Sequence, residues 1–316
     1  MRKKYQHSDN LTDYLGPRYW PTWIGYGCTW LLARLPFGWQ VAIGKALGLL
    51  MYHLARSRRH ICEVNIALCF PQLSPAEQRT LVRETFKSNG VGVMEVGLAW
   101  CRRPQDFSDR IRINGLDNLV QAQSLGRGVL LVSAHFVTIE IAGSLLSLHH
   151  PICVTYRAHK NPLFDTLMKR GRQRSFVAVI ERKEVRQTFK HLKQGHVVWY
   201  AADQDYGPKH SVFAPFFGQQ AASITATTTF ASFNQSPVVF LSHYRRNNGE
   251  YYELNFSAPL ENYPTGDEQE DVRRINILIE EAIRAAPDQY MWLHRRFKTR
   301  PDGAPDPYKK NHKGDR

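Results

Sequence analysis

A histidine and a glutamate form the pair in this sequence whose types and spacing best suit catalysis. The apolar run 129–134 ends at His135, and Glu140 follows where a helix is expected to begin. On one continuous helix, positions i and i+5 point about 140° apart, so the two side chains would diverge. With His135 in the turn after a strand and Glu140 in the next helix, the acid can hold one ring nitrogen while the other acts as a general base. The alternative is a buried histidine and a solvated glutamate that do not meet.

A second candidate is cationic. Arg172 lies in the run Met168-Lys-Arg-Gly-Arg-Gln-Arg174, near the end of an expected helix. A guanidinium there can bind phosphate or stabilise a developing oxyanion. Lys169, Arg170 and Arg174 are weaker candidates, because basic residues also complement the dipole at a helix C-terminus without any further role.

A third candidate is Asp203, directly after the expected strand 197–201. Loops at the carboxyl ends of such strands are where α/β folds place ligand groups. Turn formation explains Asp205, Gly207 and Pro208 without a function, but it explains Asp203 less well.

Several other chemistries lack their motifs. There is no G-x-S-x-G, and Ser133 lies inside an expected strand, so direct attack without a covalent enzyme intermediate is the simpler mechanism. There is no H-E-x-x-H, P-loop or G-x-G-x-x-G, and the five cysteines show neither C-x-x-C nor metal spacing with histidine. The sequence therefore predicts no metal and no cofactor, with reduced, buried thiols in a body facing the cytosol.

The elements that must position these residues alternate along the chain. Strands are expected at 129–134, 152–156, 176–180, 197–201, 238–244 and 251–256. Helices are expected after Ser74-Pro75, and at 139–148, 162–170, 183–194, 224–233 and 271–286. This alternation predicts a layered α/β domain with a mixed, partly parallel sheet flanked by helices.

Charge and aromatic content point to an anionic membrane surface. Lys and Arg number 42 against 28 Asp and Glu, a formal net charge of +14. Such an excess favours phospholipid headgroups, an acidic protein or nucleic acid as partner. From Tyr19 to Ala33 the sequence is uncharged and rich in tryptophan, and continuation past Arg34 to Trp39 would reach the roughly 17–25 residues of a membrane span. An interfacial helix and an ordinary core helix pair are the alternatives.

The expected organisation has three parts. Residues 1–40 are expected to form an N-terminal membrane anchor, 41–305 a catalytic domain and 306–316 a flexible basic tail, with a loose character from Arg300 onward.

His135 and Glu140 resemble the His-x-x-x-x-acid motif of the glycerolipid acyltransferase superfamily, and the glutamate variant resembles its late lipid A acyltransferase branch. Four further stretches, in the right order, are similar to that branch: Arg18-Tyr-Trp-Pro-Thr-Trp23, Asn65-Ile-Ala-Leu-Cys-Phe-Pro71, Val197-Val-Trp-Tyr-Ala-Ala-Asp-Gln-Asp-Tyr-Gly-Pro208 and Gln289-Tyr-Met-Trp-Leu-His-Arg-Arg-Phe-Lys-Thr-Arg-Pro301. The resemblance runs from about residue 15 to about residue 305.

The resemblance implies an activity and a location. It implies transfer of a fatty acyl group from acyl carrier protein to a hydroxyacyl chain of a Kdo-lipid A precursor, on the cytoplasmic face of a Gram-negative inner membrane. It implies His135 as base, Glu140 as its orienting acid, and Arg172 and Asp203 in the active site. It also suggests that the stretch 213–218 walls the acyl chain, whereas 292–297 is interpreted as packing plus surface charge.

Two rival functions differ in class. A glycerophosphate or lysophosphatidate acyltransferase is disfavoured by Glu140, where aspartate is usual, and by the Asp203 loop. A basic, non-catalytic protein that binds membranes or nucleic acid fits poorly with 12% aromatic residues in apolar context, so no nucleic-acid partner is expected. Acyl chain length, acceptor position and oligomeric state cannot be predicted from these residues.

Overall fold

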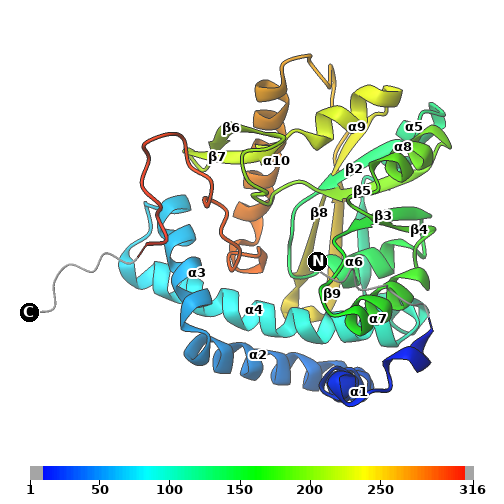
Figure 1. The fold of residues 1–316 in the computed structure, drawn as a ribbon, viewed down its shortest axis with the longest axis vertical. Helices are drawn as coiled ribbons and strands as arrows, with labels where there is room; N and C mark the ends of the chain where they lie inside the picture. The colour runs from blue at the N-terminus through cyan, green and yellow to red at the C-terminus, as the bar shows by residue number, and fades with distance from the viewer. Residues whose placement is uncertain (1–9, 310–316) are drawn as a thin grey trace, which may run out of the picture.

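A seven-stranded sheet organises the part of the chain that the computed structural model describes, residues 10–309 (Figure 1). The strand order is β1-β9-β8-β2-β5-β3-β4, and every neighbouring pair is parallel except β8 and β9. The strands of this sheet are β1 (Ile111–Asn114), β2 (Val129–Ser133), β3 (Ile152–Tyr156), β4 (Ala178–Glu181), β5 (Val197–Ala201), β8 (Val238–Arg246) and β9 (Tyr251–Phe256). The predicted α/β class and the mixed, mostly parallel sheet are confirmed.

Ten α-helices accompany the sheet within the described residues. They are α1 (Trp20–Leu32), α2 (Phe37–Leu54), α3 (Arg56–Cys69), α4 (Pro75–Cys101), α5 (Leu116–Ser124), α6 (Ile139–Leu146), α7 (Pro162–Gln173), α8 (Val185–Lys193), α9 (Ala226–Asn234) and α10 (Glu268–Ala285). A separate antiparallel hairpin, β6 (Ser211–Phe216) with β7 (Gln219–Ile224), lies beside α10 (Figure 1).

Side-chain alternation along the buried strands creates two apolar layers. On β2, Leu130 and Val132 face one core, with α10 and parts of α3, α4 and α9. Val129 and Leu131 face the other, beneath α5 and α6. Burial on both faces is the reason that the parallel strands are nearly continuous hydrophobic runs.

The longest helix, α4, supports one side of the molecule. It begins with a capping box in which Ser74 Oγ accepts from the Glu77 amide and Glu77 accepts from the Ser74 amide, with Pro75 at the first helical position. In Figure 1 it runs beneath the sheet, and α2 lies along its outer side.

Glycines allow α2 and α4 to approach closely. A Cβ at Gly90 would lie 2.0 Å from the Gly44 carbonyl oxygen, and one at Gly48 would lie 2.2 Å from the Phe86 carbonyl oxygen. Such backbone contact is possible only with small residues at the crossing. Helix α2 runs from Phe37 to Leu54, so the boundary expected at residue 40 between anchor and domain falls inside this helix.

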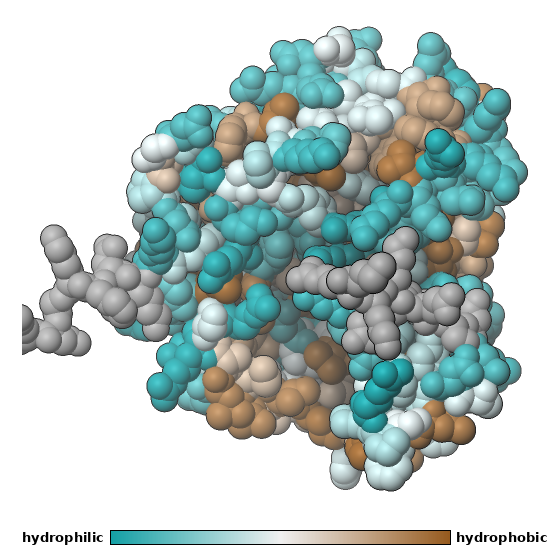
Figure 2. Space-filling view, viewed as in Figure 1, coloured by the Kyte–Doolittle hydropathy of each residue, from teal (hydrophilic) through white to brown (hydrophobic). Residues whose placement is uncertain are grey.

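The N-terminal segment departs from the predicted span. Helix α1 ends at Leu32 and α2 begins after Pro36, so the uncharged stretch does not continue as one helix through Arg34. None of the helices within residues 10–309 combines the length and hydropathy that a bilayer crossing requires. The side chains of α1 and α2 nevertheless remain partly exposed, and hydrophobic residues gather along the lower edge of Figure 2, over α2.

The expected loose tail is attached to the body at Tyr308. Tyr308 is buried, and its hydroxyl donates to Asn65 Oδ1 at 2.6 Å while accepting from the Phe297 amide at 3.0 Å. Residues 310–316 of the predicted tail lie outside the described residues.

Candidate active site

Two neighbouring parallel strands bring His135 and Asp203 together. Ser133 at the end of β2 pairs in register with Ala201 at the end of β5, and the Ala202 amide donates to the Ser133 carbonyl. The residues that follow each strand therefore meet at one edge of the sheet, where α/β folds place their ligands.

His135 is held by Asp203 at short range. Its Nδ1 lies 2.6 Å from Asp203 Oδ1, which also accepts from the His135 backbone amide at 3.1 Å. The other carboxylate oxygen accepts a 2.8 Å hydrogen bond from the Tyr290 hydroxyl. Because the carboxylate accepts, the proton is assigned to Nδ1, and Nε2 is left as the basic nitrogen of the neutral ring.

Asp203 remains ionised although it is only 2% exposed. Burial alone would raise the pKa of its carboxyl, but the His135 charge and the hydrogen bonds from His135 and Tyr290 lower that pKa to about 2. A permanent negative charge therefore faces Nδ1 and can stabilise an imidazolium formed at His135.

The loop carrying His135 is fixed by the segment 289–291. The Val137 amide donates to the Gln289 carbonyl at 2.8 Å, and the Met291 amide donates to the His135 carbonyl at 3.0 Å. These bonds make a short antiparallel bridge that also places Tyr290 on Asp203. On the opposite side, Gly92 of α4 lies so near Val137 that an added Cβ would lie 3.0 Å from its side chain.

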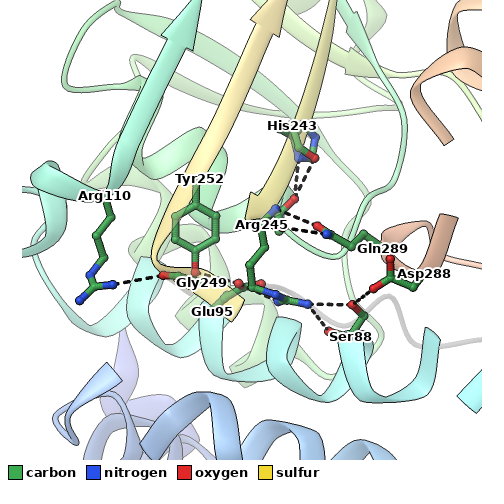
Figure 3. Close-up of polar contacts among 10 residues, drawn as sticks. Ser88, Glu95, Arg110, His243, Arg245, Gly249, Tyr252, Asp288 and Gln289 are labelled. Atoms are coloured by element: carbon green, nitrogen blue, oxygen red, sulfur yellow. Dashed lines mark hydrogen bonds and ion pairs between the residues drawn. The ribbon is translucent and has the colours of Figure 1, made fainter. Parts of the chain in front are cut away.

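A buried polar network anchors that bridge to α4 (Figure 3). The Gln289 side chain exchanges two hydrogen bonds with the backbone of Arg245 on β8. The Arg245 guanidinium forms a 2.8 Å ion pair with Glu95 and donates to Ser88 Oγ, both on α4. Arg245 and Glu95 are buried, so this pair is a specific link between helix, sheet and catalytic loop.

A second histidine near His135 is unsuited to proton transfer. His243 on β8 is fully buried, with Nδ1 2.8 Å from Thr138 Oγ1. Burial, with a further contribution from His135, lowers the pKa of His243 to about 3. This ring stays neutral and packs edge-on against Phe136 and Trp199.

Glu140 does not hold His135, which corrects the pairing predicted from the sequence. Its carboxylate forms a two-pronged ion pair with Arg172 and also accepts from Trp100 Nε1 at 2.8 Å. Burial would raise the pKa of Glu140, but the charge and hydrogen bonds of Arg172 lower it. The residues at 135 and 140 are neighbours in the sequence, yet each takes a partner from another element.

His135, Glu140 and Arg172 line one cavity of about 530 Å³, and Asp203 lies behind His135. Arg157, Arg172 and Arg182 give its wall a positive character, and Glu140 is the only carboxylate among the residues that line it within the described chain. The lining residues are His135, Ile139, Glu140, Val154, Thr155, Tyr156, Arg157, His159, Met168, Arg172, Phe176, Arg182, Trp199, Tyr200, Ala201, Gln204, Tyr206 and Met291. The volume and the mixture of apolar wall with a few charged groups suit an elongated anionic ligand.

The predicted site residues His135, Glu140, Arg172 and Asp203 are therefore gathered at one place. Sequence reasoning missed Tyr290, Arg157 and Arg182 as parts of it. Tyr290 belongs to the stretch 289–301, which carries part of the family resemblance. Arg157 comes directly after β3, and Arg182 comes directly after β4. The strand-end position that singled out Asp203 could have identified the two arginines as well.

The stretches 213–218 and 292–297 were also given roles from the sequence. The stretch 213–218 forms most of β6 and its turn and does not line this cavity, so its role as an acyl-chain wall stays a prediction. In the stretch 292–297, Trp292 and Phe297 are buried as predicted, but Arg296 is buried too, donating to the Ala222 carbonyl and to Ser223 Oγ instead of contributing surface charge.

Comparison with known proteins adds the family. Residues 8–299 match the family model described as bacterial lipid A biosynthesis acyltransferase. The lipid A biosynthesis lauroyltransferase of Escherichia coli K12 is 39% identical over 94% of this chain and 97% of its own length. The lipid A biosynthesis palmitoleoyltransferase of the same organism is 38% identical over 92% of this chain and 95% of its own.

A solved structure is similar only in part. The 1-acyl-sn-glycerophosphate acyltransferase from Thermotoga maritima overlaps 73% of this chain and 97% of its own with a TM-score of 0.36 and 13% identity. A likeness this slight supports no argument about substrate or mechanism.

Proposed function

Since the chain belongs to the bacterial lipid A biosynthesis acyltransferase family, we propose that it transfers a fatty acyl chain from acyl carrier protein to a hydroxyacyl chain of a Kdo-lipid A precursor. The observation that carries this proposal is the His135 ring on the cavity wall, with Nδ1 fixed by a buried, ionised Asp203. That arrangement leaves Nε2 to accept a proton from an acceptor hydroxyl.

The proposed reaction is a direct transfer. His135 Nε2 removes the hydroxyl proton as the oxygen attacks the thioester carbonyl, the new C–O bond forms, and the C–S bond then breaks. The proton passes from the imidazolium to the leaving thiolate. Asp203, not Glu140, stabilises the imidazolium in this mechanism, and no cofactor takes part.

Glu140 receives a different role. It fixes the Arg172 guanidinium at the cavity wall through two hydrogen bonds, so Arg172 keeps its charge and position before substrate arrives. Arg172, Arg157 and Arg182 together supply positive charge for an anionic headgroup or for the oxyanion of the tetrahedral intermediate.

A covalent acyl-enzyme is the mechanistic alternative. Within the described chain, no cysteine and no serine lines the cavity, and this includes Ser133. We expect intact-protein mass spectrometry after mixing with the acyl donor alone to show no added acyl mass. A stoichiometric acyl adduct that disappears on adding the lipid acceptor would contradict direct transfer.

A substrate panel tests the function itself. Purified enzyme should acylate a Kdo-lipid A precursor from acyl carrier protein thioesters and should not acylate glycerol 3-phosphate or lysophosphatidate. Lauroyl, myristoyl and palmitoleoyl donors all belong in the panel, because relatives with two different acyl names are nearly equally identical to this chain. Faster acylation of lysophosphatidate would favour the rival acyltransferase instead.

The proposed location is the cytoplasmic face of the inner membrane, with α1 and α2 in the headgroup layer. Exposed apolar side chains on this segment support it: Trp20, Ile24, Trp30, Leu31, Trp39, Leu50, Met51 and Leu54. Arg34 lies 3.2 Å over the Trp30 ring, and Arg56, Arg58 and Arg59 follow α2. Aromatic residues beside basic ones are typical of interfacial helices on anionic lipid.

A matched set of leucines tests this anchor. Leu31→Asp with Leu54→Asp should release much of the protein from anionic vesicles in a flotation assay, since these side chains are 61% and 68% exposed. Leu125→Asp on the far side is the control, because Leu125 is similarly exposed at 54%. Equal release by the control would place the membrane surface elsewhere.

A further inference from the structure

Away from the cavity, a cysteine and two histidines converge at the opposite end of the sheet. Cys153 is near the start of β3, His191 is in the last turn of α8, and His196 immediately precedes β5. One ligand atom from each residue lies within 4.8 Å of the others. The cavity begins farther along the same strands, at Val154 on β3 and Trp199 on β5.

The separations between these atoms match a tetrahedral metal centre. Cys153 Sγ lies 3.6 Å from His191 Nδ1, and the two histidine Nδ1 atoms lie 3.0 Å apart. A tetrahedral zinc ion with Zn–S near 2.3 Å and Zn–N near 2.0–2.1 Å requires S–N and N–N separations of about 3.6 and about 3.3 Å. These two separations are close to the zinc values and need little adjustment to accept an ion.

The local fold fixes all three donors. Gly195 adopts a φ of 82°, which lets the chain reverse after α8, and the His196 amide donates to the His191 carbonyl at 3.0 Å. Ile152 pairs with Val197 and Cys153 with Val198, so the thiol lies next to the entry into β5. Cys153 belongs to the same apolar layer as Leu192 of α8, which directs its side chain toward the helix end.

The arrangement also leaves an open coordination position. Cys153 is buried, whereas His191 and His196 are partly exposed, so solvent reaches the outer side of the cluster. Cysteine and histidine together select a borderline-soft divalent ion over magnesium or calcium. Three protein donors and one water complete a tetrahedron.

We propose that Cys153, His191 and His196 bind a Zn²⁺ ion that ties the start of β3 and the entry to β5 to the end of α8. The ion lies away from His135 and takes no part in acyl transfer. This proposal is independent of the proposed function, because it concerns metal content and folding stability and not turnover.

The experiment uses the full chain in detergent, purified without a polyhistidine tag. After incubation with Zn²⁺ and gel filtration, elemental analysis should give one zinc per chain. Co²⁺ in place of zinc should produce a thiolate-to-metal charge-transfer band and visible ligand-field bands. At free Zn²⁺ about a hundredfold above Kd, the Tm should rise by about 4 °C.

Variants assign the ligands. Cys153→Ser and His196→Gln should each remove the charge-transfer band or weaken zinc binding at least tenfold, and abolish the Tm rise. Cys28→Ser and His149→Gln are controls at exposed positions and should bind zinc as the parent does. His196→Gln keeps the test decisive if Cys153→Ser fails to fold.

Two results would overturn the proposal. One is less than a tenth of an equivalent of zinc in the folded parent protein. The other is zinc that remains fully bound in folded His196→Gln. Either would mean that the three groups form only a hydrogen-bonded chain from the thiol through the two rings.

Discussion

Two acid–base pairs lie at the same cavity and differ in what they can do. In His135–Asp203, a buried carboxylate holds one ring nitrogen and leaves the other for proton transfer. In Glu140–Arg172, the carboxylate engages two guanidinium nitrogens, and neither partner exchanges its proton near neutral pH. In the proposed mechanism the first pair moves a proton and the second supplies fixed positive charge.

The difference also shows how partners are chosen. His135 and Glu140 are five positions apart, but Asp203 is 68 residues from His135 and Arg172 is 32 residues from Glu140. Pairing of β2 with β5 brings the first two together, and the packing of α6 and α7 against the same helix, α4, brings the second two together. Sheet topology outweighs sequence proximity here.

The largest expected effect is the loss of acyl transfer when His135 is replaced. His135→Ala should lower the rate of acyl transfer about 10²–10⁴-fold, because it removes the general base. The free energy of unfolding should also fall, because the buried Asp203 carboxylate loses its hydrogen bond to the ring, but this loss is much smaller than the effect on the rate. His149→Ala, at an exposed position, is the control. Near-normal turnover in His135→Ala would refute the assigned mechanism.

Breaking the other pair should act mainly on stability. Glu140→Gln leaves the Arg172 charge without its partner, at a cost of about 3–5 kcal/mol in the free energy of unfolding. The double variant Glu140→Gln with Arg172→Gln should lose less than the sum of the two single variants, as a double-mutant cycle measures. Glu270→Gln, in the exposed pair with Arg273, should have little effect.

The same experiment could also support the pairing of Glu140 with His135 that the sequence predicts. A folded Glu140→Gln protein with undiminished stability and a rate as low as that of His135→Ala would assign Glu140 to proton transfer. The separation of roles drawn above would then be wrong.

Acid unfolding tests the charge on Asp203. Its pKa of about 2 lies below the ordinary value of 3.8, so its contribution to stability is present above about pH 4 and is lost as the pH falls toward 2. The loss should amount to about 2 kcal/mol. Asp203→Asn should lack this component when unfolding free energies are measured between pH 2 and 5, whereas Asp109→Asn at an exposed position should retain it.

The sequence predicted local elements better than their partners. The strands of the buried runs, the helix after Ser74 and the Asn161 cap depend on neighbouring residues and were found near their predicted bounds; the Asn161 side chain accepts from the Phe164 amide as a cap does. His135 and Asp203 lie at the cavity because strand ends converge at one edge of a parallel sheet, and Glu140 and Arg172 reach it from helices α6 and α7.

What the sequence could not supply is long-range pairing. Whether Glu140 contacts His135 or Arg172 depends on where α7 packs, and no local pattern encodes that position. The same holds for Cys153, which is 38 residues from His191 and has no metal-ligand spacing in the sequence. The helix break between α1 and α2 was missed because the hydrophobic run conceals a turn before Pro36.

The smallest expected effect concerns Tyr290, which acts on His135 only through Asp203. Tyr290→Phe keeps the buried ring but removes the 2.8 Å hydrogen bond to Asp203 Oδ2, so one carboxylate oxygen loses a donor and the pKa of Asp203 should rise. A weaker partner for the imidazolium should lower kcat about fivefold, as expected for the loss of about 1 kcal/mol, with KM nearly unchanged. Tyr308→Phe is the matched control, because its buried hydroxyl bonds Asn65 away from the cavity and its loss should reduce stability without reducing the rate. If both variants turn over alike, Asp203 orients His135 without help from Tyr290, and the bridge 289–291 serves only to fix the backbone of the catalytic loop.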